Sequence, residues 1–322
     1  MPVIFPHWQP FAPLQPLHLN WLADAGVEVA VLRLDLLDPL ISGNKWFKLK
    51  PHIAAAAEAG CAGLMSLGGA HSNHLHALAA AGRRFSFETV GLLRGEPRDT
   101  PTVRDLQHFG MQLHWLGYGG YRQRHHAGFW VDWQARYPEL LAVNEGGGGL
   151  PAALACREIV EMARAQLAEL GWDDYQGWWL AAGTGTTAAG LVLAEEGRRM
   201  VHVATAVPAG HGVEVLLPAI LHEAGRADIG YRLLDASRGG FGRVDAELTR
   251  CMRDCEVSAE LPLEPLYTGK ALMALRNEVA AGYFAAGTRL LMLHSGGLQG
   301  RRAMALEGNA VQPISERIAV DE

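Results

Sequence analysis

The chain has 322 residues, 49% of them hydrophobic, and a formal net charge of −6. These values indicate a compact protein of about two domains. Basic residues are scattered rather than clustered, so the charge pattern argues against nucleic-acid binding. No apolar run approaches the roughly 18 residues of a membrane-spanning helix, and the N-terminal residues do not have the basic and apolar regions of a secretory signal.

Apolar periodicity predicts strands that alternate with helices. In chain order we expect a strand at 28–34, a helix at 45–59, a strand at 63–67, a helix at 72–82, a strand at 89–94, a helix at 102–109, a strand at 112–116, a helix at 122–136, a strand at 140–143, a helix at 151–170, a strand at 177–182, a helix from 185, a strand at 200–206, a helix at 213–224, a strand near 231–234, helices after 245 and 270, and a strand ending at 294. This alternation is typical of the α/β class, and it predicts open twisted, mostly parallel sheets flanked by helices.

Four cysteines occur in the chain, and their spacing is not that of a disulfide framework. Cys251 and Cys255 lie one helical turn apart and could form half of a zinc site, but there is no matching second pair. We therefore predict reduced thiols and a cytoplasmic location.

Glycine-rich polar segments follow four of the predicted strands. They read GGAHSNHLH after the strand at 63–67, EGGGGL after 140–143, GTGTTAAG after 177–182 and SGGLQG after the strand ending at 294. Parallel sheets bind ligands at the carboxyl ends of their strands. Several of these segments also open a helix, and a helix N-terminus attracts an anion. The sequence therefore predicts an anion-binding crevice.

The segment GTGTTAAG also fits the G-x-G-x-x-G/A pattern of dinucleotide-binding proteins. That pattern expects an acidic residue about 20 positions further on, and there is none between Gly197 and Val213. The hydroxyls of Thr184, Thr186 and Thr187 suit a phosphate monoester better than a pyrophosphate. A glycine-lined turn with capping threonines is the simpler alternative, and a nicotinamide-dependent oxidoreductase is another.

Lys45 follows the predicted turn and N-cap Ser42-Gly43-Asn44, at the start of a helix. The helix dipole disfavours an ammonium ion there, and a neutral amine is the form that makes a Schiff base. A lysine of this kind beside a monophosphate site predicts pyridoxal 5'-phosphate as the cofactor. We expect Lys48 and Lys50 to be solvated charges.

The segment SGNKWFKLK resembles the GGNK-x-RKLE segment of the pyridoxal-phosphate enzymes grouped as 1-aminocyclopropane-1-carboxylate (ACC) deaminase and D-cysteine desulfhydrase. The resemblance continues in order through LGGAHSNHLHALAAAG, NEGGGGLPAAL, AAGTGTTAAG, GGFG, LYTGKAL and LHSGGLQG, which span most of the chain. It implies the tryptophan-synthase-β-like fold, also called fold type II, with two sheets. It also implies a larger cofactor-binding domain of residues 1–44 plus 145–322, a smaller domain of residues 45–144, and the site between them.

The resemblance also assigns roles to residues. Lys45 would carry the cofactor and act in catalysis with Ser72 and Tyr267. Besides Lys45, the cofactor would be bound by Asn73, Gly183, Thr184, Gly185, Thr186, Thr187 and Ser295. The substrate carboxylate would be bound by Ser72, Asn73 and His74, with His71 nearby as a substrate contact, an acid or base, or a residue that only bonds the backbone. Either Lys45 or Ser72 would take the proton from the substrate Cα.

No metal site is expected, because His74 and His76 would point about 200° apart on a helix. The chain departs from the family pattern on the substrate side, at His71, at Phe241 in place of a common tyrosine, and at Gly148 and Gly149 in place of Ser-Asn. Because these departures affect the substrate side, a non-catalytic binding protein with this fold is an alternative.

The predicted function is that of a lyase or deaminase that acts on a small amino acid and releases a 2-oxo acid and ammonia. In ACC deaminases a glutamate after the tyrosine faces the pyridine nitrogen, whereas this chain has Thr268 there and a hydroxyl residue at Ser295. A neutral partner for the nitrogen favours β-elimination from D-cysteine, with ACC deamination as the alternative. The resemblance further implies a homodimer. We expect no nucleic-acid or membrane partner.

Overall fold

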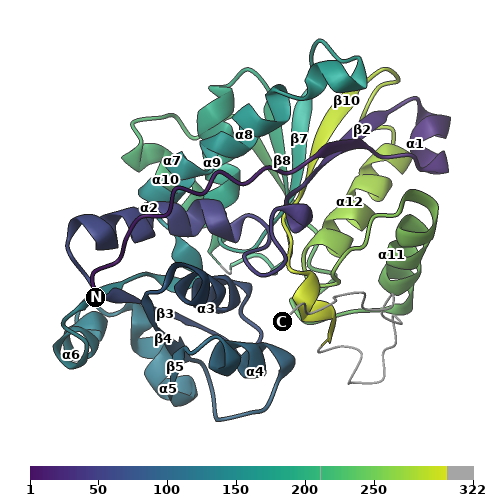
Figure 1. Cartoon of the computed structure of the whole chain (residues 1–322). Helices are drawn as coiled ribbons and strands as arrows, with labels where there is room; N and C mark the ends of the chain where they lie inside the picture. Colours follow the sequence, from purple (N-terminus) through teal and green to yellow (C-terminus); the bar gives the residue numbers. More distant parts are fainter. Residues whose placement is uncertain (211, 303–322) are drawn as a thin grey trace, which may run out of the picture.

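The computed structural model describes residues 1–210 and 212–302. The chain forms two mainly parallel sheets with helices packed against them (Figure 1), so the predicted α/β fold class is confirmed. Strands of residues 14–33 and 177–294 form one sheet, and strands of residues 63–142 form the other. The exact domain boundaries stay a prediction, and residues 303–322 of the predicted larger domain lie outside the described residues.

The larger sheet has six strands in the order β1-β2-β10-β7-β8-β9. These are β1 Leu14–Pro16, β2 Glu28–Arg33, β7 Gly177–Ala182, β8 Met200–Thr205, β9 Tyr231–Asp235 and β10 Arg289–His294. β1 runs antiparallel to β2, and the other pairs are parallel. All six residues of β7 are buried, because helices cover both faces of this central strand.

The smaller sheet is wholly parallel, in the order β5-β4-β3-β6. Its strands are β3 Gly63–Gly68, β4 Glu88–Leu93, β5 Gln112–Trp115 and β6 Leu140–Ala142. The central strand β3 is again buried at every position.

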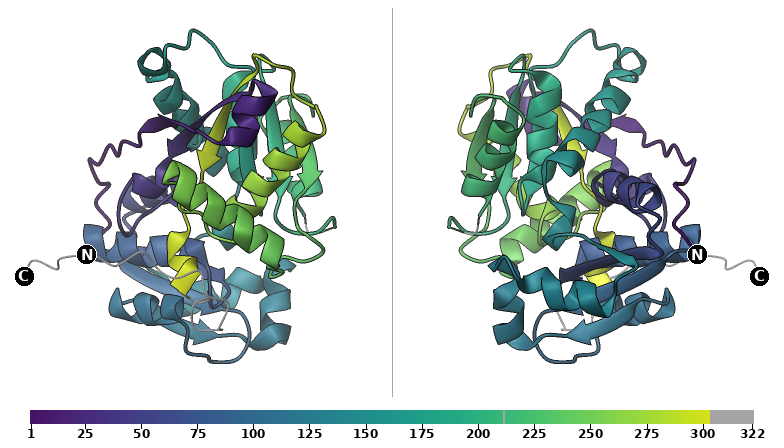
Figure 2. Two further views of the ribbon diagram at one scale, coloured as in Figure 1. Left: turned by 90° about the vertical axis from the view of Figure 1, so that its right-hand side faces the viewer. Right: turned by 90° about the vertical axis from the view of Figure 1, so that its left-hand side faces the viewer.

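Twelve α-helices occur in the described part of the chain: α1 Asn20–Ala25, α2 Lys45–Glu58, α3 Asn73–Phe85, α4 Pro101–His108, α5 Gly117–Arg122, α6 Phe129–Arg136, α7 Leu150–Ala155, α8 Arg157–Arg164, α9 Thr186–Glu195, α10 Val213–Glu223, α11 Ala246–Ala259 and α12 Thr268–Ala280. Helix α9 is buried at all ten positions. Helix α2 packs against α7 and α3 and runs between the two sheets (Figures 1 and 2), so its first turn lies where the loops of both sheets can reach it.

Two predicted helices are wrong as continuous elements. The region predicted at 122–136 is divided into α5, a 3-10 turn at Gln123–His125 and α6, and Gly128 precedes the new start. The region predicted at 151–170 breaks at Cys156, between α7 and α8. At this break α9 approaches closely, since a Cβ on Gly190 would lie 2.5 Å from the Cβ of Cys156. Strand β1 and helix α1 were not predicted.

Candidate active site

The loops at the carboxyl ends of strands from both sheets meet at the start of α2. Gly43 lies against Ser295, which follows β10, and a Cβ on Gly43 would lie 2.0 Å from the Ser295 carbonyl oxygen. Gly43 also has φ +78°, so glycine alone fits at this contact. The next backbone amide, Asn44 N–H, donates to the same carbonyl at 3.2 Å. The carboxyl end of β10 is thereby fixed against the turn that precedes Lys45.

Lys45 is the first residue of α2, as predicted, and is half-buried. Its Nζ donates to Asn44 Oδ1 at 2.8 Å, and Asn44 Nδ2 donates to Thr187 Oγ1 at 2.9 Å. Asn44 occupies the N-cap position, but its side chain makes no capping hydrogen bond. It connects Lys45 to the threonine loop instead. Burial lowers the pKa of Lys45 from 10.5 to about 8, so a fraction of the amine is neutral near neutral pH.

Lys48 contradicts the expectation of a solvated charge, because its side chain is only 3% exposed. It lies one turn after Lys45 on the same face of α2, and its Nζ is 3.4 Å from Thr184 Oγ1. Burial, and then the neighbouring Lys45, lower the pKa of Lys48 to about 7. None of the carboxylates in the described ranges forms an ion pair with it. Binding of an anion beside Nζ would stabilise its charged form.

The threonine loop, residues Gly183–Thr187, joins β7 to α9 and supplies further donors. Gly185 is the N-cap of α9 and has φ +77°, so the free amides of the first helical turn point toward the crevice. Thr184 Oγ1 and Thr186 Oγ1 lie 3.4 Å apart beside Lys48. The Thr187 hydroxyl is already used, since it accepts from Asn44 and bonds the thiol of Cys156.

The loop after β6 closes the same space. A Cβ on Gly146 would lie 3.3 Å from Thr184 Cγ2 and 3.7 Å from Lys48 Nζ, and one on Gly148 would lie 3.4 Å from Thr186 Oγ1. Two threonine hydroxyls, a buried lysine and a helix N-terminus therefore converge on a space bordered by glycines. This combination fits a phosphate group.

Ser72 is the N-cap of α3, and its Oγ accepts a hydrogen bond from Leu75 N at 3.2 Å. Gly68 permits this position, because a Cβ there would lie 2.5 Å from Ser72 Oγ. Asn73 Oδ1 accepts from Gln299 Nε2 at 2.8 Å, which connects α3 to the segment after β10. This segment is the yellow turn that reaches the smaller sheet in Figure 2. The start of α3 thus lies beside the segment that follows β10, since a Cβ on Gly297 would also lie 2.8 Å from Asn73 Nδ2.

The ring of His74 is buried inside the smaller sheet's layer. Its Nε2 lies 2.8 Å from Ser66 Oγ, whose single proton goes to the carbonyl of Val143 at 2.8 Å. His74 Nε2 must therefore carry a proton, which leaves Nδ1 as a buried acceptor without a partner in the structure. His76 points elsewhere, to Asp105 at 3.1 Å, and His71 is exposed.

Tyr267 lies over the threonine loop, because a Cβ on Gly183 would be 3.0 Å from Tyr267 Cε1. Burial, and then the carboxylates of Glu264 and Glu145, raise the pKa of the Tyr267 phenol, so it remains protonated. Thr268 does not extend into the crevice. Its hydroxyl lies 3.3 Å from Glu264 Oε1, and that carboxylate caps α12 by accepting from Tyr267 N and Thr268 N at 2.8 and 2.6 Å.

Sequence reasoning missed Lys48 and Glu264. The spacing of Lys48 from Lys45 was a usable signal, since residues three apart share a helix face. Glu264 gave no such signal, because its role depends on the turn that brings it to the start of α12. Both residues are buried. Glu264 raises the pKa of Lys45 and of Tyr267, and Lys45 lowers the pKa of Lys48.

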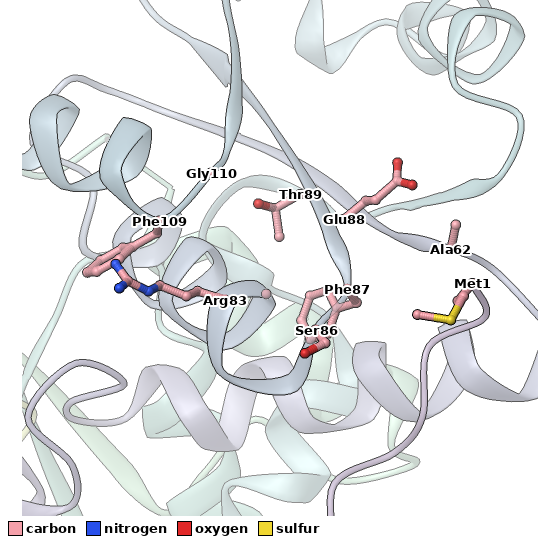
Figure 3. A pocket seen from close by; sticks show the side chains of 10 residues that line it. Met1, Ala62, Arg83, Ser86, Phe87, Glu88, Thr89, Phe109 and Gly110 are labelled. Carbon is pink, nitrogen blue, oxygen red and sulfur yellow. The ribbon is translucent and has the colours of Figure 1, made fainter. Parts of the chain in front are cut away.

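A hollow of 340 Å³ lies at the opposite end of the smaller sheet (Figure 3). Ala62 and Glu88, which line it, stand at the amino ends of β3 and β4, away from the crevice. Arg83 and Phe109 border it from the ends of α3 and α4. None of the predicted site residues lines this hollow.

No family model matches the chain. An ACC deaminase from Ralstonia pickettii is 28% identical in an alignment that covers 89% of this chain and 91% of that protein. A crystal structure of an ACC deaminase homologue superposes with a TM-score of 0.79 at 22% identity and covers 96% of this chain and 95% of its own. A hydrogen sulfide-producing enzyme from Fusobacterium nucleatum shares the fold at a TM-score of 0.62 and 14% identity, over 89% and 93% of the two chains.

These findings support the family of pyridoxal-phosphate-dependent ACC deaminases and D-cysteine desulfhydrases. The family prediction made from the motifs is therefore confirmed, and the chain spans most of the length of its relatives in this family. The roles of the individual site residues stay predictions. Among the described helices, none is long and apolar enough to cross a membrane.

Proposed function

We propose that the protein is a pyridoxal-phosphate-dependent lyase or deaminase that acts on a small amino acid. The observation that carries this proposal is the pair of lysines at the start of α2, of which Lys45 is half-buried and Lys48 is buried. Lys45 has a pKa lowered to about 8, and Lys48 lies beside the threonine loop without a counter-ion in the described structure. A Schiff-base lysine and a phosphate site at this spacing match the two ends of one cofactor.

The residues present fit that cofactor. Lys45 would hold it covalently, and Lys48, Thr184, Thr186 and the amides of the first turn of α9 would hold its phosphate. Asn73 and Ser295 would lie near its ring. When bound, pyridoxal phosphate supplies an electron sink for negative charge that develops at the substrate Cα.

The protein's own part is to bind, orient and move protons. Lys45 Nζ is the group that we propose to take the proton from the substrate Cα, since its amine is partly neutral. Ser72 Oγ, which accepts from Leu75 N, is the alternative base; its hydroxyl would first have to give up its own proton before it could take the proton from Cα. The N-terminus of α3 would bind the substrate carboxylate through backbone amides. Tyr267, which stays protonated, would supply a hydrogen-bond donor on the opposite side.

Borohydride reduction followed by peptide mapping tests the proposal. The purified protein should absorb in the visible range, and the reduced cofactor should be found on Lys45. Labelling of Lys48 or Lys270 in its place would refute the assignment of Lys45. A colourless preparation that takes up no added cofactor would refute the proposed function itself.

For the substrate, we propose β-elimination from cysteine-like amino acids, D-cysteine first. The support comes from the residues expected near the pyridine nitrogen. Thr268 replaces a glutamate, and its hydroxyl is turned toward Glu264. Ser295 is neutral, so the ring would remain a weaker electron sink, which is sufficient when a thiolate leaves.

ACC deamination is the second candidate, and it is favoured by the name of the Ralstonia pickettii relative. Release of pyruvate from D-cysteine and of 2-oxobutanoate from ACC should be measured on one preparation. We expect turnover of D-cysteine and little or none of ACC. Turnover of ACC alone would overturn the preference and leave the residues at 268 and 295 without an explanation.

We also propose a cytoplasmic homodimer. The support for the compartment is that all four cysteines are free thiols, as expected in a reducing environment. Sedimentation of the cofactor-loaded protein would test the dimer, and a monomer at micromolar concentration would contradict it.

A further inference from the structure

Lys270 lies in the first turn of α12, a position where the helix dipole disfavours a cation. Its side chain is only 1% exposed. The Nζ nevertheless has three close acceptors, the backbone carbonyl oxygens of Ser237, Gly240 and Phe241, at 2.9, 2.8 and 2.8 Å. Neither catalysis nor cofactor binding, as described above, uses this group.

The number of acceptors fixes the charge of Lys270. A carbonyl oxygen accepts but cannot donate, so three such contacts require three N–H groups on Nζ. A neutral amine has two N–H groups and an ammonium ion has three. Burial lowers the pKa of Lys270 and the nearby Glu264 raises it, but the geometry of the three contacts is that of the charged form. The three carbonyls and the ammonium ion together form a cation site.

The loop that contributes the carbonyls, residues 237–241, depends on this cation. Three carbonyl dipoles aimed at one buried point repel one another, and each costs free energy if left without a donor. Gly240 N donates to the Ser237 carbonyl and Arg243 N to the Gly240 carbonyl, each at 3.2 Å, whereas the donor to the Phe241 carbonyl among the described contacts is Lys270 Nζ. The Lys270 ammonium therefore adds a charged donor to the Ser237 and Gly240 carbonyls and holds the Phe241 carbonyl, so the position of Phe241 depends most on this cation.

The same loop reaches the candidate active site. The Phe241 ring packs edge-on against the Tyr267 ring, with centroids 5.3 Å apart and an interplanar angle of 64°. Tyr267 in turn lies against Gly183 of the threonine loop. Lys270 thus connects the backbone of Phe241 to the helix that begins just after Tyr267.

We propose that the Lys270 ammonium is a built-in monovalent cation that positions Phe241 against Tyr267, and that its removal creates a vacant site for ammonium, primary alkylammonium or potassium ions. Lys270 is in this sense a positioning residue. Wild-type protein should accordingly show no requirement for an added monovalent cation. The chemical class of the ligand follows from three carbonyl oxygens about one hydrogen-bond length from the centre.

The test is chemical rescue of Lys270→Ala. This substitution removes three methylene groups and the amine, which is the shape of n-propylamine. We expect the variant to lose at least about tenfold in turnover, because three buried carbonyls lose a charged donor, and to melt at a lower temperature. Propylammonium chloride should restore turnover and melting temperature in a saturable manner, and ammonium and potassium ions should restore them partially. Lithium, a smaller ion, should not do so at the same ionic strength.

Three controls make the rescue specific. Wild-type protein in the same amine corrects for reaction of the amine with the cofactor. Lys50→Ala removes a surface lysine that pairs with Glu158, and amines should not change its stability or turnover. Lys270→Met retains the apolar stem, which blocks the vacated space, so it should lose turnover and show no rescue.

If Lys270→Ala does not fold, it should be refolded in propylammonium chloride and in lithium chloride of equal ionic strength, and the proposal requires recovery only in the former. The proposal would be overturned if propylammonium gave no saturable rescue of the folded Lys270→Ala protein and no recovery on refolding. An equal effect of propylammonium on Lys50→Ala would also overturn it. The turnover arm rests on the proposed function, whereas the melting and refolding arms do not. Absence of turnover in the wild type would refute the proposed function, and saturable rescue of stability would still support the cation site; rescue of stability without rescue of turnover, in an active wild type, would refute the positioning role.

Discussion

Replacement of Lys48 by Met is the sharpest test of the proposed phosphate site. The substitution retains the apolar stem and removes a buried ammonium that lies 3.4 Å from Thr184 Oγ1. A buried hydrogen bond to a charged group contributes about 1.5–3 kcal/mol, so the variant should bind the cofactor roughly 10- to 150-fold more weakly. Equilibrium dialysis, with absorbance as the readout, measures this ratio. Lys50→Met, on the same helix and paired with Glu158 at the surface, should match the wild type.

The pH dependence of the ratio between the dissociation constants of Lys48→Met and wild type tests whether the charge of Lys48 causes the difference in cofactor affinity. In the free site the pKa of Lys48 is lowered to about 7, and a phosphate dianion beside Nζ raises it. The contribution of Lys48 to affinity is therefore complete below pH about 7 and is lost as the pH rises through the pKa of the loaded protein. The ratio of the two dissociation constants should shrink on the alkaline side. Equal affinity of wild type and Lys48→Met at pH 7, or equal weakening in Lys50→Met, would show that the phosphate is bound elsewhere.

Two further predictions concern the same crevice. Attachment of added cofactor to cofactor-free protein should become faster as the pH rises through about 8, because the neutral fraction of Lys45 increases. Stopped-flow absorbance measures the rate, and a pH-independent rate would contradict the assigned amine. Gly185→Ala and Gly171→Ala both place a side chain at positive φ, +77° and +69°, and each should cost about 1–3 kcal/mol of stability. Only Gly185→Ala should weaken cofactor retention, and equal retention in both variants would reduce the threonine loop to a turn.

The sequence was sufficient for the features that depend on local pattern. Alternating apolar runs predicted the parallel sheets, and the dipole argument identified Lys45 as unusual without any coordinates. The sequence pattern did not predict the features that depend on tertiary contacts. The helix predicted at 151–170 breaks beside Gly190 of α9, which lies more than 30 positions away in the chain. The burial of Lys48 likewise depends on Gly146 and Thr184, which approach it from two other loops.

Lys45 and Lys48 lie among the first four residues of α2 and Lys270 among the first four of α12, and the number of acceptors separates their roles. Among the described residues, Lys45 Nζ donates to the amide oxygen of Asn44 at 2.8 Å, and Lys48 Nζ has one long contact with Thr184 Oγ1 at 3.4 Å. In a buried site such a lysine gains little from its third proton, so it can give up that proton to become a nucleophile, or retain it when an anion binds. Lys270 has three carbonyl acceptors, and each of its protons is already bound. Two lysines with unused protons therefore suit chemistry and anion binding, and the one whose protons are all used suits structure. This criterion does not depend on the family resemblance; it separates Lys45 and Lys48 from Lys270, and the resemblance then assigns the cofactor to Lys45.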